Sequence, residues 1–229
     1  MEIVPAILPA SREDLARKLA LLSEAGFSGC VQIDAVDGRF AAPANWPFSS
    51  GEALPEELPF AGRFSFDADL MTADPAREAE RYLAAGAARI TIHAESALDL
   101  GALLARLRRR LGHEKDFMPD LVSLGLALSL ETPLSLVEPH LAEVDYVQLM
   151  GIARVGRQHE PFDARVLPKL AALARRAPEL PIQIDGGVSL ASAPRLLKAG
   201  ATRLVVGSAL FGAGDLAAAL KRFEMLSFW

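Results

Sequence analysis

The chain contains a weak internal repeat, in which a helical pattern ends in Ala-Gly and a short β-rich run follows. The three Ala-Gly pairs are residues 25–26, 85–86 and 199–200. Glycine just after a helix supplies the left-handed residue that closes the helix. The apolar run after each pair predicts a strand buried on both faces, as strands of parallel sheets are. The repeat therefore predicts helices that alternate with parallel strands.

Between the repeats, the hydrophobic pattern predicts eight strands, each followed by a helix. The predicted strands are Ile3–Leu8, Cys30–Asp34, Phe64–Leu70, Ile90–His93, Leu124–Leu128, Tyr146–Met150, Ile182–Asp185 and Leu204–Val206. The predicted helices are Arg12–Ala25, Glu52–Leu58, Pro75–Ala85, Leu98–Leu111, Leu134–Leu141, Ala164–Arg175, Ala191–Ala199 and Leu216–Phe223. Two helix starts carry capping signals, a Ser11-x-x-Asp14 pattern and Asp74 before a first-turn proline.

Eight strand–helix units with short connections close into an α/β fold of the (β/α)8 TIM barrel type. We expect one such domain over residues 1–229. A doubly wound open sheet is the alternative. It would normally carry Gly-x-Gly-x-x-Gly after its first strand, whereas residues 8–11 read Leu-Pro-Ala-Ser. The same absence gives no reason to expect a nucleotide cofactor.

The composition limits the partners and the location that we expect. A formal net charge of −5 gives no reason to expect nucleic acid or an anionic membrane surface as a partner. Residues 1–5 do not resemble a signal peptide, and no apolar run reaches the ~18–20 residues that span a bilayer. A single cysteine, Cys30, in an apolar strand pattern fits a buried thiol in a reducing compartment. We therefore expect a cytoplasmic protein.

Acidic residues follow several of the predicted strands. In a (β/α)8 barrel the functional groups gather at the carboxyl ends of the strands. Side chains two positions apart on a strand share a face, so Gln32 sides with Asp34, and Asp67 with Asp69. We expect Asp34, Asp69 and Asp185 to converge on the mouth of the barrel. Any one aspartate could be a helix cap, but three like charges in a partly buried site need a shared proton or a cation.

Two glycine-containing turns follow the seventh and eighth predicted strands, Gly186-Gly187 and Gly207-Ser208. Glycines let backbone N–H groups approach an anion, and this part of a barrel is a common phosphate site. Tight turns also need glycine, so either pair alone is a weak indication. We predict that these four residues bind a phosphate group. Arg154 and Arg157 could assist because guanidinium groups suit phosphate oxygens, although both could equally be solvated.

Lysine and histidine give mostly negative information. The lysines fall in predicted helices or in a polar connection, so Schiff-base chemistry and a lysine base are not expected; they are Lys18, Lys169, Lys198 and Lys221 in helices and Lys115 in the connection. His93 is the one histidine on a predicted strand, where a structural role competes with a role in the site. The others are interpreted as surface or loop residues, namely His113, His140 and His159.

Six short runs spread along the chain are similar to the motifs of one known family. Residues 5–8 read Pro-Ala-Ile-Leu, residues 33–40 read Ile-Asp-Ala-Val-Asp-Gly-Arg-Phe, and residues 66–71 read Phe-Asp-Ala-Asp-Leu-Met. Three further runs lie at 92–95, 183–188 and 206–211. Together they resemble the ribulose-phosphate 3-epimerase family, whose first three motifs are Pro-Ser-Ile-Leu, Val-Asp-Val-Met-Asp-Gly-His-Phe and Asp-Val-His-Leu-Met. The run around Asp34 is the most specific of the six.

This resemblance implies a barrel of the ribulose-phosphate-binding type and an epimerase or isomerase reaction on a ketose phosphate. The family inverts the carbon next to the ketone of a pentulose phosphate through an enediolate. One aspartate removes a proton and a second aspartate delivers a proton to the opposite face. These two roles map onto Asp34 and Asp185. In the family, a metal held by these aspartates and two histidines stabilises the enediolate oxygens.

The chain departs from the family at several site positions. Gln32 and Asp69 stand where the family has its metal histidines, Ala6 replaces a serine, and residues 153–159 replace a glycine-rich loop. The remaining ligand set is all oxygen, which favours Mg²⁺ or Mn²⁺ over Zn²⁺; it comprises Gln32, Asp34, Asp69 and Asp185. Without a cation, we expect at least one of the three carboxyl groups to have a raised pKa.

We expect the ligand to be a small phosphorylated sugar, and we leave a homo-oligomer open. The predicted lining of the substrate pocket is Ala6, Met71, His93, Met150, Arg154 and Arg157. One alternative is a lyase or decarboxylase that acts on a related phosphorylated substrate. The decarboxylase relatives carry Asp-x-Lys-x-x-Asp, whereas residues 34–37 read Asp-Ala-Val-Asp, without the lysine. The other alternative is a non-catalytic barrel that binds sugar phosphates.

Overall fold

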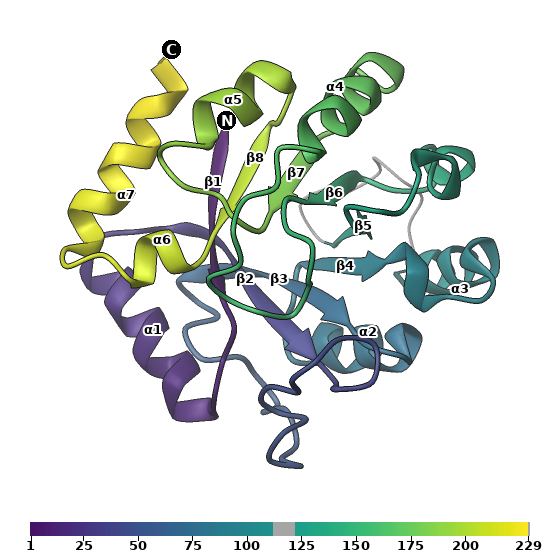
Figure 1. Cartoon of the computed structure of the whole chain (residues 1–229). Coiled ribbons are helices and arrows are strands. Elements are labelled where there is room, and N and C mark those ends of the chain that lie inside the picture. The colour runs from purple at the N-terminus through teal and green to yellow at the C-terminus, as the bar shows by residue number, and fades with distance from the viewer. Residues whose placement is uncertain (112–121, 229) are drawn as a thin grey trace.

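A computed structural model describes residues 1–111 and 122–228. In this part of the chain, eight parallel strands close into a barrel in sequence order (Figure 1). The strands are β1 (Glu2–Ile7), β2 (Gly29–Val36), β3 (Phe64–Met71), β4 (Arg89–His93), β5 (Ser123–Leu128), β6 (Tyr146–Met150), β7 (Ile182–Asp185) and β8 (Arg203–Val206). The pairing of β1 with β8 completes the ring and rules out the open sheet. The predicted (β/α)8 barrel is confirmed.

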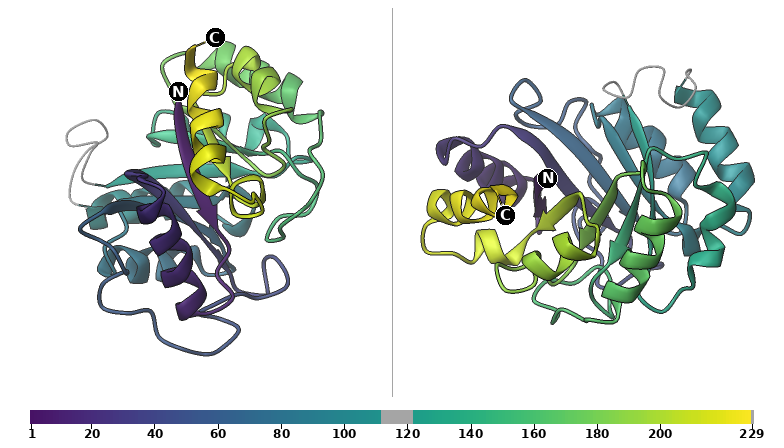
Figure 2. Two further views of the ribbon diagram at one scale, coloured as in Figure 1. Left: turned by 90° about the vertical axis from the view of Figure 1, so that its left-hand side faces the viewer. Right: turned by 90° about the horizontal axis from the view of Figure 1, so that it is seen from above.

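Helices surround the ring of strands (Figure 2). They are α1 (Arg12–Glu24), α2 (Pro75–Ala84), α3 (Leu100–Leu111), α4 (Val166–Arg176), α5 (Ala193–Ala199), α6 (Ser208–Phe211) and α7 (Leu216–Glu224). Short 3₁₀ turns are η1 (Ala94–Ser96), η2 (Leu134–Leu136), η3 (Glu138–His140) and η4 (Met225–Phe228). Both predicted caps are present, since Ser11 accepts a hydrogen bond from Asp14 N and Asp74 accepts one from Arg77 N. No helix in the described ranges is long and apolar enough to cross a membrane.

Two predicted helices are wrong. The segment 52–58 is irregular, because Pro55 interrupts it and lacks the N–H group that a helix interior needs. Its Leu58 N donates instead to Ala85 O, which anchors the segment beneath α2. The segment 134–141 forms the two turns η2 and η3 instead of one helix, since Pro139 again removes an interior donor. The barrel therefore lacks regular α-helices after β2 and β5.

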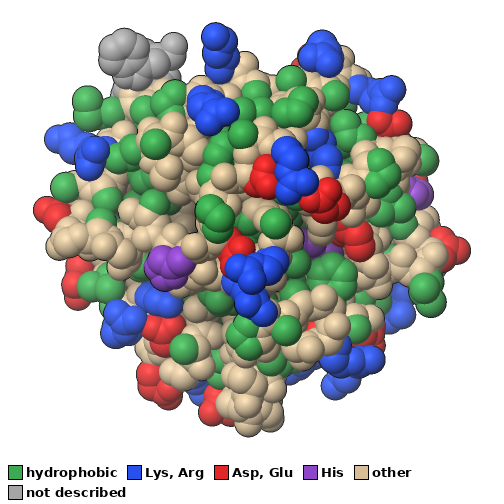
Figure 3. All heavy atoms as spheres, in the orientation of Figure 1, with side chains coloured by type: hydrophobic (Ala, Val, Ile, Leu, Met, Phe, Trp, Pro, Cys, Tyr) green, Lys and Arg blue, Asp and Glu red, His purple; other side chains and the backbone are tan. Residues whose placement is uncertain are grey.

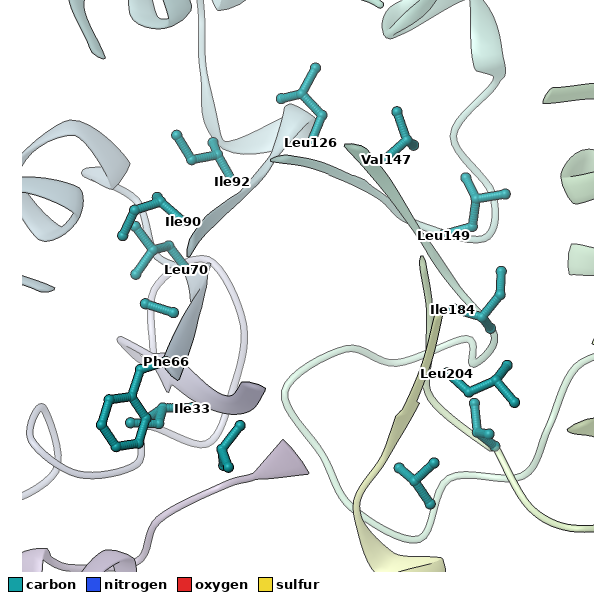
Figure 4. Packing of buried hydrophobic residues seen from close by; sticks show 14 of the residues in the cluster. Ile33, Phe66, Leu70, Ile90, Ile92, Leu126, Val147, Leu149, Ile184 and Leu204 are labelled. Carbon is teal, nitrogen blue, oxygen red and sulfur yellow. The ribbon is translucent and has the colours of Figure 1, made fainter. Parts of the chain in front are cut away.

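The main apolar core lies between the strands and the surrounding helices. Figure 4 shows Ile33, Leu70, Ile92, Leu149 and Ile184 pointing outward from the ring of strands, and each is fully buried or nearly so. Because strand side chains alternate between two faces, the residues next to these point into the barrel. The apolar, β-rich runs of the sequence therefore supply the strand side chains that point outward and are buried against the helices.

The interior of the barrel is polar. Gln32, Asp67, Thr91, Gln148 and Gln183 are all 0% exposed and come from five different strands. Barrel interiors are usually filled by layers of branched apolar side chains. Here a small apolar cluster shares that space, and its members are Val4, Ala6, Cys30 and Val205. A hydrogen-bonded network therefore replaces much of the usual apolar filling.

Two residues show how this interior is accommodated. Gly125 leaves room for a large neighbour, since a Cβ there would lie 2.3 Å from the ring of Tyr146. Burial, and next the charge of Asp67, raise the pKa of the Cys30 thiol to about 12. The predicted buried thiol is confirmed, and its raised pKa disfavours the reactive thiolate.

Candidate active site

A cavity of about 560 Å³, its open mouth included, lies at the carboxyl ends of the strands. Asp34 and Asp185 from β2 and β7 form part of its wall, together with Met71 and Met150 from β3 and β6. The loop that joins β6 to α4 passes in front of the strands in the view of Figure 1. Figure 3 shows acidic and basic side chains side by side near the middle of the same face. Ala6 also lines the cavity.

The three predicted aspartates converge. Asp34, Asp69 and Asp185 each offer a carboxylate oxygen, and these oxygens lie within 4.8 Å of one another. Asp69 is fully buried, whereas the other two face the cavity. Gln32 Nε2 donates to Asp34 Oδ1 at 2.8 Å and to Asp185 Oδ2 at 3.0 Å. Gln32 therefore presents N–H groups to the aspartates in this structure, and not the oxygen ligand that the sequence had suggested.

Burial and mutual repulsion change the protonation of this cluster. Burial raises the pKa of Asp185 to about 7, and the charge of Asp69 adds to the effect. The pKa of Asp34 lies well above its usual value, first because of burial and then because of the charges of Asp185 and Asp69. The expectation of at least one raised carboxyl pKa is confirmed. Near neutral pH, the pair can hold a proton on one carboxyl group while the other is ionised.

His93 lies behind the aspartates and does not line the cavity as predicted. Its side chain is fully buried, with Nε2 3.3 Å from Asp69 Oδ1. The ring of Phe40 packs against it, with 5.3 Å between centroids. Burial alone would lower the pKa of His93, but the charge and hydrogen bond of Asp69 and the charge of Glu95 raise it. The pairing with Asp69 explains the position of His93. The strand pattern of the sequence could not reveal this contact, because the two residues lie on different strands.

The two glycine turns lie together on the cavity wall. Gly186, Gly187, Gly207 and Ser208 all line it. Gly187 has a φ of +67°, and a Cβ there would lie 2.5 Å from Phe162 Cα, so glycine is required at this position. The four residues predicted to bind phosphate therefore line the same cavity as Asp34 and Asp185. Phosphate binding by them stays a prediction.

The two loop arginines occupy different positions. Arg157 lines the cavity, and its Nε donates to Ala42 O at 3.0 Å, which links the β6–α4 loop to the β2–β3 connection. Arg154 does not line the cavity and pairs with Glu160, with Nη2 2.7 Å from Oε1. The sequence interpretation missed His159, which we had expected at the surface or in a loop. It is an exposed loop residue with a φ of 63°, but it also lines the cavity.

The prediction that four of the lysines lie in helices is confirmed. Lys18, Lys169, Lys198 and Lys221 all lie in helices. No lysine is among the described residues that line the cavity. Lys115 and His113 lie outside the part of the chain that the structure describes. An amine nucleophile is therefore not supplied by any described residue of this cavity.

A closed parallel barrel with polar groups at the carboxyl ends of its strands defines the class of (β/α)8 barrels. Within this class, the chain belongs to the ribulose-phosphate 3-epimerase family, whose sequence pattern matches residues 2–211. It is 29% identical over 220 residues to a ribulose-phosphate 3-epimerase of Bacillus subtilis, covering 94% of each protein. It is 31% identical over 213 residues to a ribulose-phosphate 3-epimerase of Treponema pallidum, covering 91% of this chain and 90% of the relative.

Solved structures support the same fold. A crystal structure of 3-hexulose-6-phosphate synthase matches with a TM-score of 0.64 and 22% identity, over 99% of both chains. A structure of KGPDC from Streptococcus mutans in complex with D-R5P matches with a TM-score of 0.69 and 15% identity, over 98% of this chain and 95% of that one. At these identities the likeness shows the barrel fold and carries no conclusion about the reaction.

Proposed function

We propose that this protein is an epimerase of a ketose phosphate, in which Asp34 and Asp185 act as two acid/base groups. The observation that carries the proposal is that both aspartates line the same cavity as the two glycine turns. Asp34 lies near the end of β2 and Asp185 ends β7. These strands are separated by β1 and β8 around the ring, so the two carboxyl groups approach the cavity from different directions. Inversion of a carbon needs a proton donor and a proton acceptor on opposite faces, which a single group cannot provide.

The raised pKa values suit this division of labour. An ionised aspartate accepts the proton from the carbon next to the ketone, while the protonated partner delivers a proton to the other face. Burial raises the pKa of both carboxyl groups toward the working pH, where proton transfer in either direction is efficient. The reverse reaction exchanges the two roles. This explains why a buried pair of like-charged groups is retained at the mouth of the barrel.

The phosphate of the substrate would bind at Gly186, Gly187, Gly207 and Ser208. The positive φ values of Gly186 and Gly187 open the backbone at the cavity wall, where N–H groups can approach an anion. Arg157 lies on the same cavity and would add positive charge, and the His159 ring there could donate a hydrogen bond to the phosphate. Arg154 is assigned no part, because Glu160 already neutralises it.

A hard divalent cation such as Mg²⁺ or Mn²⁺ fits the oxygens of Asp34, Asp69 and Asp185, which lie within 4.8 Å of one another. When bound there, it would supply positive charge that stabilises the negative oxygens of the deprotonated ketose phosphate. The protein residues still carry the proton transfers, since each aspartate has a second oxygen. The all-oxygen donor set favours these cations over Zn²⁺.

The proposal is tested by proton exchange in heavy water. Wild-type protein with added Mg²⁺ or Mn²⁺ is expected to exchange the proton beside the ketone of ribulose 5-phosphate and to form the epimer, followed by ¹H NMR. Asp34→Asn and Asp185→Asn should each lower epimerisation by ~10³-fold or more, because an amide cannot act as the base. Asp215→Asn is the matched control, since this residue caps α7, is not among the residues that line the cavity, and can be replaced by asparagine as a cap.

Three outcomes would contradict the proposal or its phosphate site. Full epimerisation by the Asp185→Asn protein would refute the assignment of the two aspartates. No exchange by the wild-type protein, with pentulose and hexulose phosphates and either cation, would favour a barrel that binds sugar phosphates without catalysis. Unphosphorylated ribulose should react far more slowly, and equal rates for both sugars would remove the assigned phosphate site.

A further inference from the structure

Three fully buried glutamines lie beneath the aspartates. They are Gln32 on β2, Gln148 on β6 and Gln183 on β7, and each is 0% exposed. Gln183 Nε2 donates to Gln32 Oε1 at 3.1 Å and to Gln148 Oε1 at 2.7 Å. Gln183 is therefore the centre of a chain of amides that spans the barrel interior. Unlike Asp34 and Asp185, it does not line the cavity.

The amide hydrogen bonds run outward from Gln183 on both sides, through Gln32 and through Gln148, toward the aspartates. Gln32 receives a hydrogen bond on its oxygen and donates through Nε2 to Asp34 and Asp185. Gln148 also receives on its oxygen, and it donates through Nε2 to Asp69 Oδ2 at 3.0 Å. An amide has donors on its nitrogen and acceptors on its oxygen, so the direction of one amide dictates that of the next. The three carboxylates thus receive N–H groups whose direction is set at Gln183.

Asp67 explains why Gln183 takes this direction. Asp67 Oδ2 lies 3.3 Å from Gln183 Nε2, and Asp67 Oδ1 accepts from the Thr91 hydroxyl at 2.9 Å and the Tyr146 hydroxyl at 3.2 Å. If the Gln183 amide were reversed, its oxygen would face this carboxyl group and two amide oxygens. In the described part of the chain, Gln183 Oε1 has no hydrogen-bond partner. The orientation is therefore chosen by the acceptors around the nitrogen.

We propose that Gln183 is a positioning residue that makes Gln32 a hydrogen-bond donor to both aspartates and prevents it from acting as a cation ligand. To ligate a cation, Gln32 would have to turn its oxygen toward Asp34 and Asp185. Its nitrogen would then face the nitrogen of Gln183, donor against donor. The bridging N–H groups hold the two carboxyl groups together and compete with a cation for their oxygens. The inference rests on the proposed function only in treating Asp34 and Asp185 as the acid/base pair.

Binding of Mn²⁺ without substrate tests the inference in four proteins: wild type, Gln32→Met, Gln183→Met and the double variant. Methionine matches glutamine in length and lacks its N–H groups. Affinity is measured by electron paramagnetic resonance of free Mn²⁺. Gln32→Met should bind Mn²⁺ at least as tightly as wild type. Gln183→Met should bind it about tenfold more tightly, because Gln32 is then free to turn its oxygen inward. In the double variant this gain should vanish.

Several results would overturn the inference. The first is that Gln32→Met binds Mn²⁺ tenfold more weakly than wild type, and the second is that Gln183→Met binds it no more tightly than wild type. The third is that Gln183→Met raises the affinity equally whether or not Gln32 is present. The fourth is that none of the four proteins binds Mn²⁺ detectably. Ile184→Val is the matched control on β7, since this side chain points outward, and it should leave the affinity unchanged. Circular dichroism checks folding, and Gln183→Leu replaces the methionine variant if that variant unfolds. Because no substrate is present, failure here differs from failure of the epimerase proposal.

Discussion

Asp74 and Asp215 accept hydrogen bonds from N–H groups in the first turns of α2 and α7, and both lie at the surface. Asp34 and Asp185 have the same side chain but are held inside a cavity beside a third carboxyl group. Their proton affinity is therefore set by burial and by one another, as the raised pKa values show. At the scale of single residues, surroundings decide whether an aspartate caps a helix or holds a proton.

Asp185→Asn should change how stability depends on pH. The pKa of Asp185 is about 7 in the folded protein because of burial, against an ordinary value of 3.8. Between these two values the unfolded chain releases the proton first, so stability falls as pH rises through this window. Asparagine does not ionise, so the variant does not lose stability in this pH window. Urea unfolding should show the variant gaining roughly 2 kcal/mol over wild type between pH 5 and pH 8.5. Parallel curves for both proteins would contradict the raised pKa, and Asp215→Asn should follow wild type.

At the scale of elements, the sequence pattern located strands better than connections. The two wrong helices, 52–58 and 134–141, each contain a proline that interrupts the helical hydrogen bonds. The turns that follow β5 depend instead on a side chain from another element. Lys169 on α4 directs Nζ at Ser129 O, Leu130 O and Thr132 O, at 2.9, 2.5 and 2.6 Å. The ammonium group of Lys169 therefore donates to carbonyl groups that the backbone N–H groups of a helix would otherwise have bonded after β5.

Lys169→Met should destabilise the protein by roughly 2–3 kcal/mol, because it leaves three partly buried carbonyl groups without their donor. The loss is measured as the change in the free energy of unfolding by chemical denaturation. Lys221→Met on the exposed side of α7 is the control and should stay within about 0.5 kcal/mol of wild type. A Lys169 variant as stable as the control would show that water satisfies these carbonyl groups.

At the scale of the whole molecule, the two ends of the barrel differ in chemistry. The carboxyl end holds the clustered acids, and the amino end is joined by ion pairs across strands. Glu2 on β1 contacts Arg89 on β4 and Arg203 on β8, each at 2.9 Å. The guanidinium of Arg203 also lies over the ring of Tyr146 inside the barrel, 5.0 Å from its centroid. These contacts connect strands that are distant in sequence and include the β1–β8 pair that closes the ring.

Glu2→Gln should lower the free energy of unfolding by roughly 1–2 kcal/mol, because two mostly buried guanidinium groups lose their counter-charge. The side chain of Glu2 is 34% exposed, which keeps the effect below that of a fully buried pair. High salt should narrow the difference between the two proteins in denaturant titrations. Glu57→Gln, an exposed residue of the β2–β3 connection, is the control and should be neutral. An equal effect of both changes would argue against a role in closing the barrel.

The sequence alone determined the barrel, the places of its eight strands to within a few residues and the convergence of Asp34, Asp69 and Asp185. These features follow from local periodicity and helix-closing glycines, together with the rule that all strands of such a barrel end at one edge. The caps at Ser11 and Asp74 were also predictable, because a cap bonds to a residue only a few positions away.

Only the tertiary structure decided what each polar side chain meets across the barrel. Gln32 is two positions from Asp34 but 153 positions from Asp185, and it bonds to both. The orientation of the Gln32 amide depends on Gln183, which is 151 positions away. His159 reached the cavity through a loop that carries no periodic signal. Hydrogen-bond direction and carboxyl pKa depend on partners from other strands, and those partners are chosen when the ring closes.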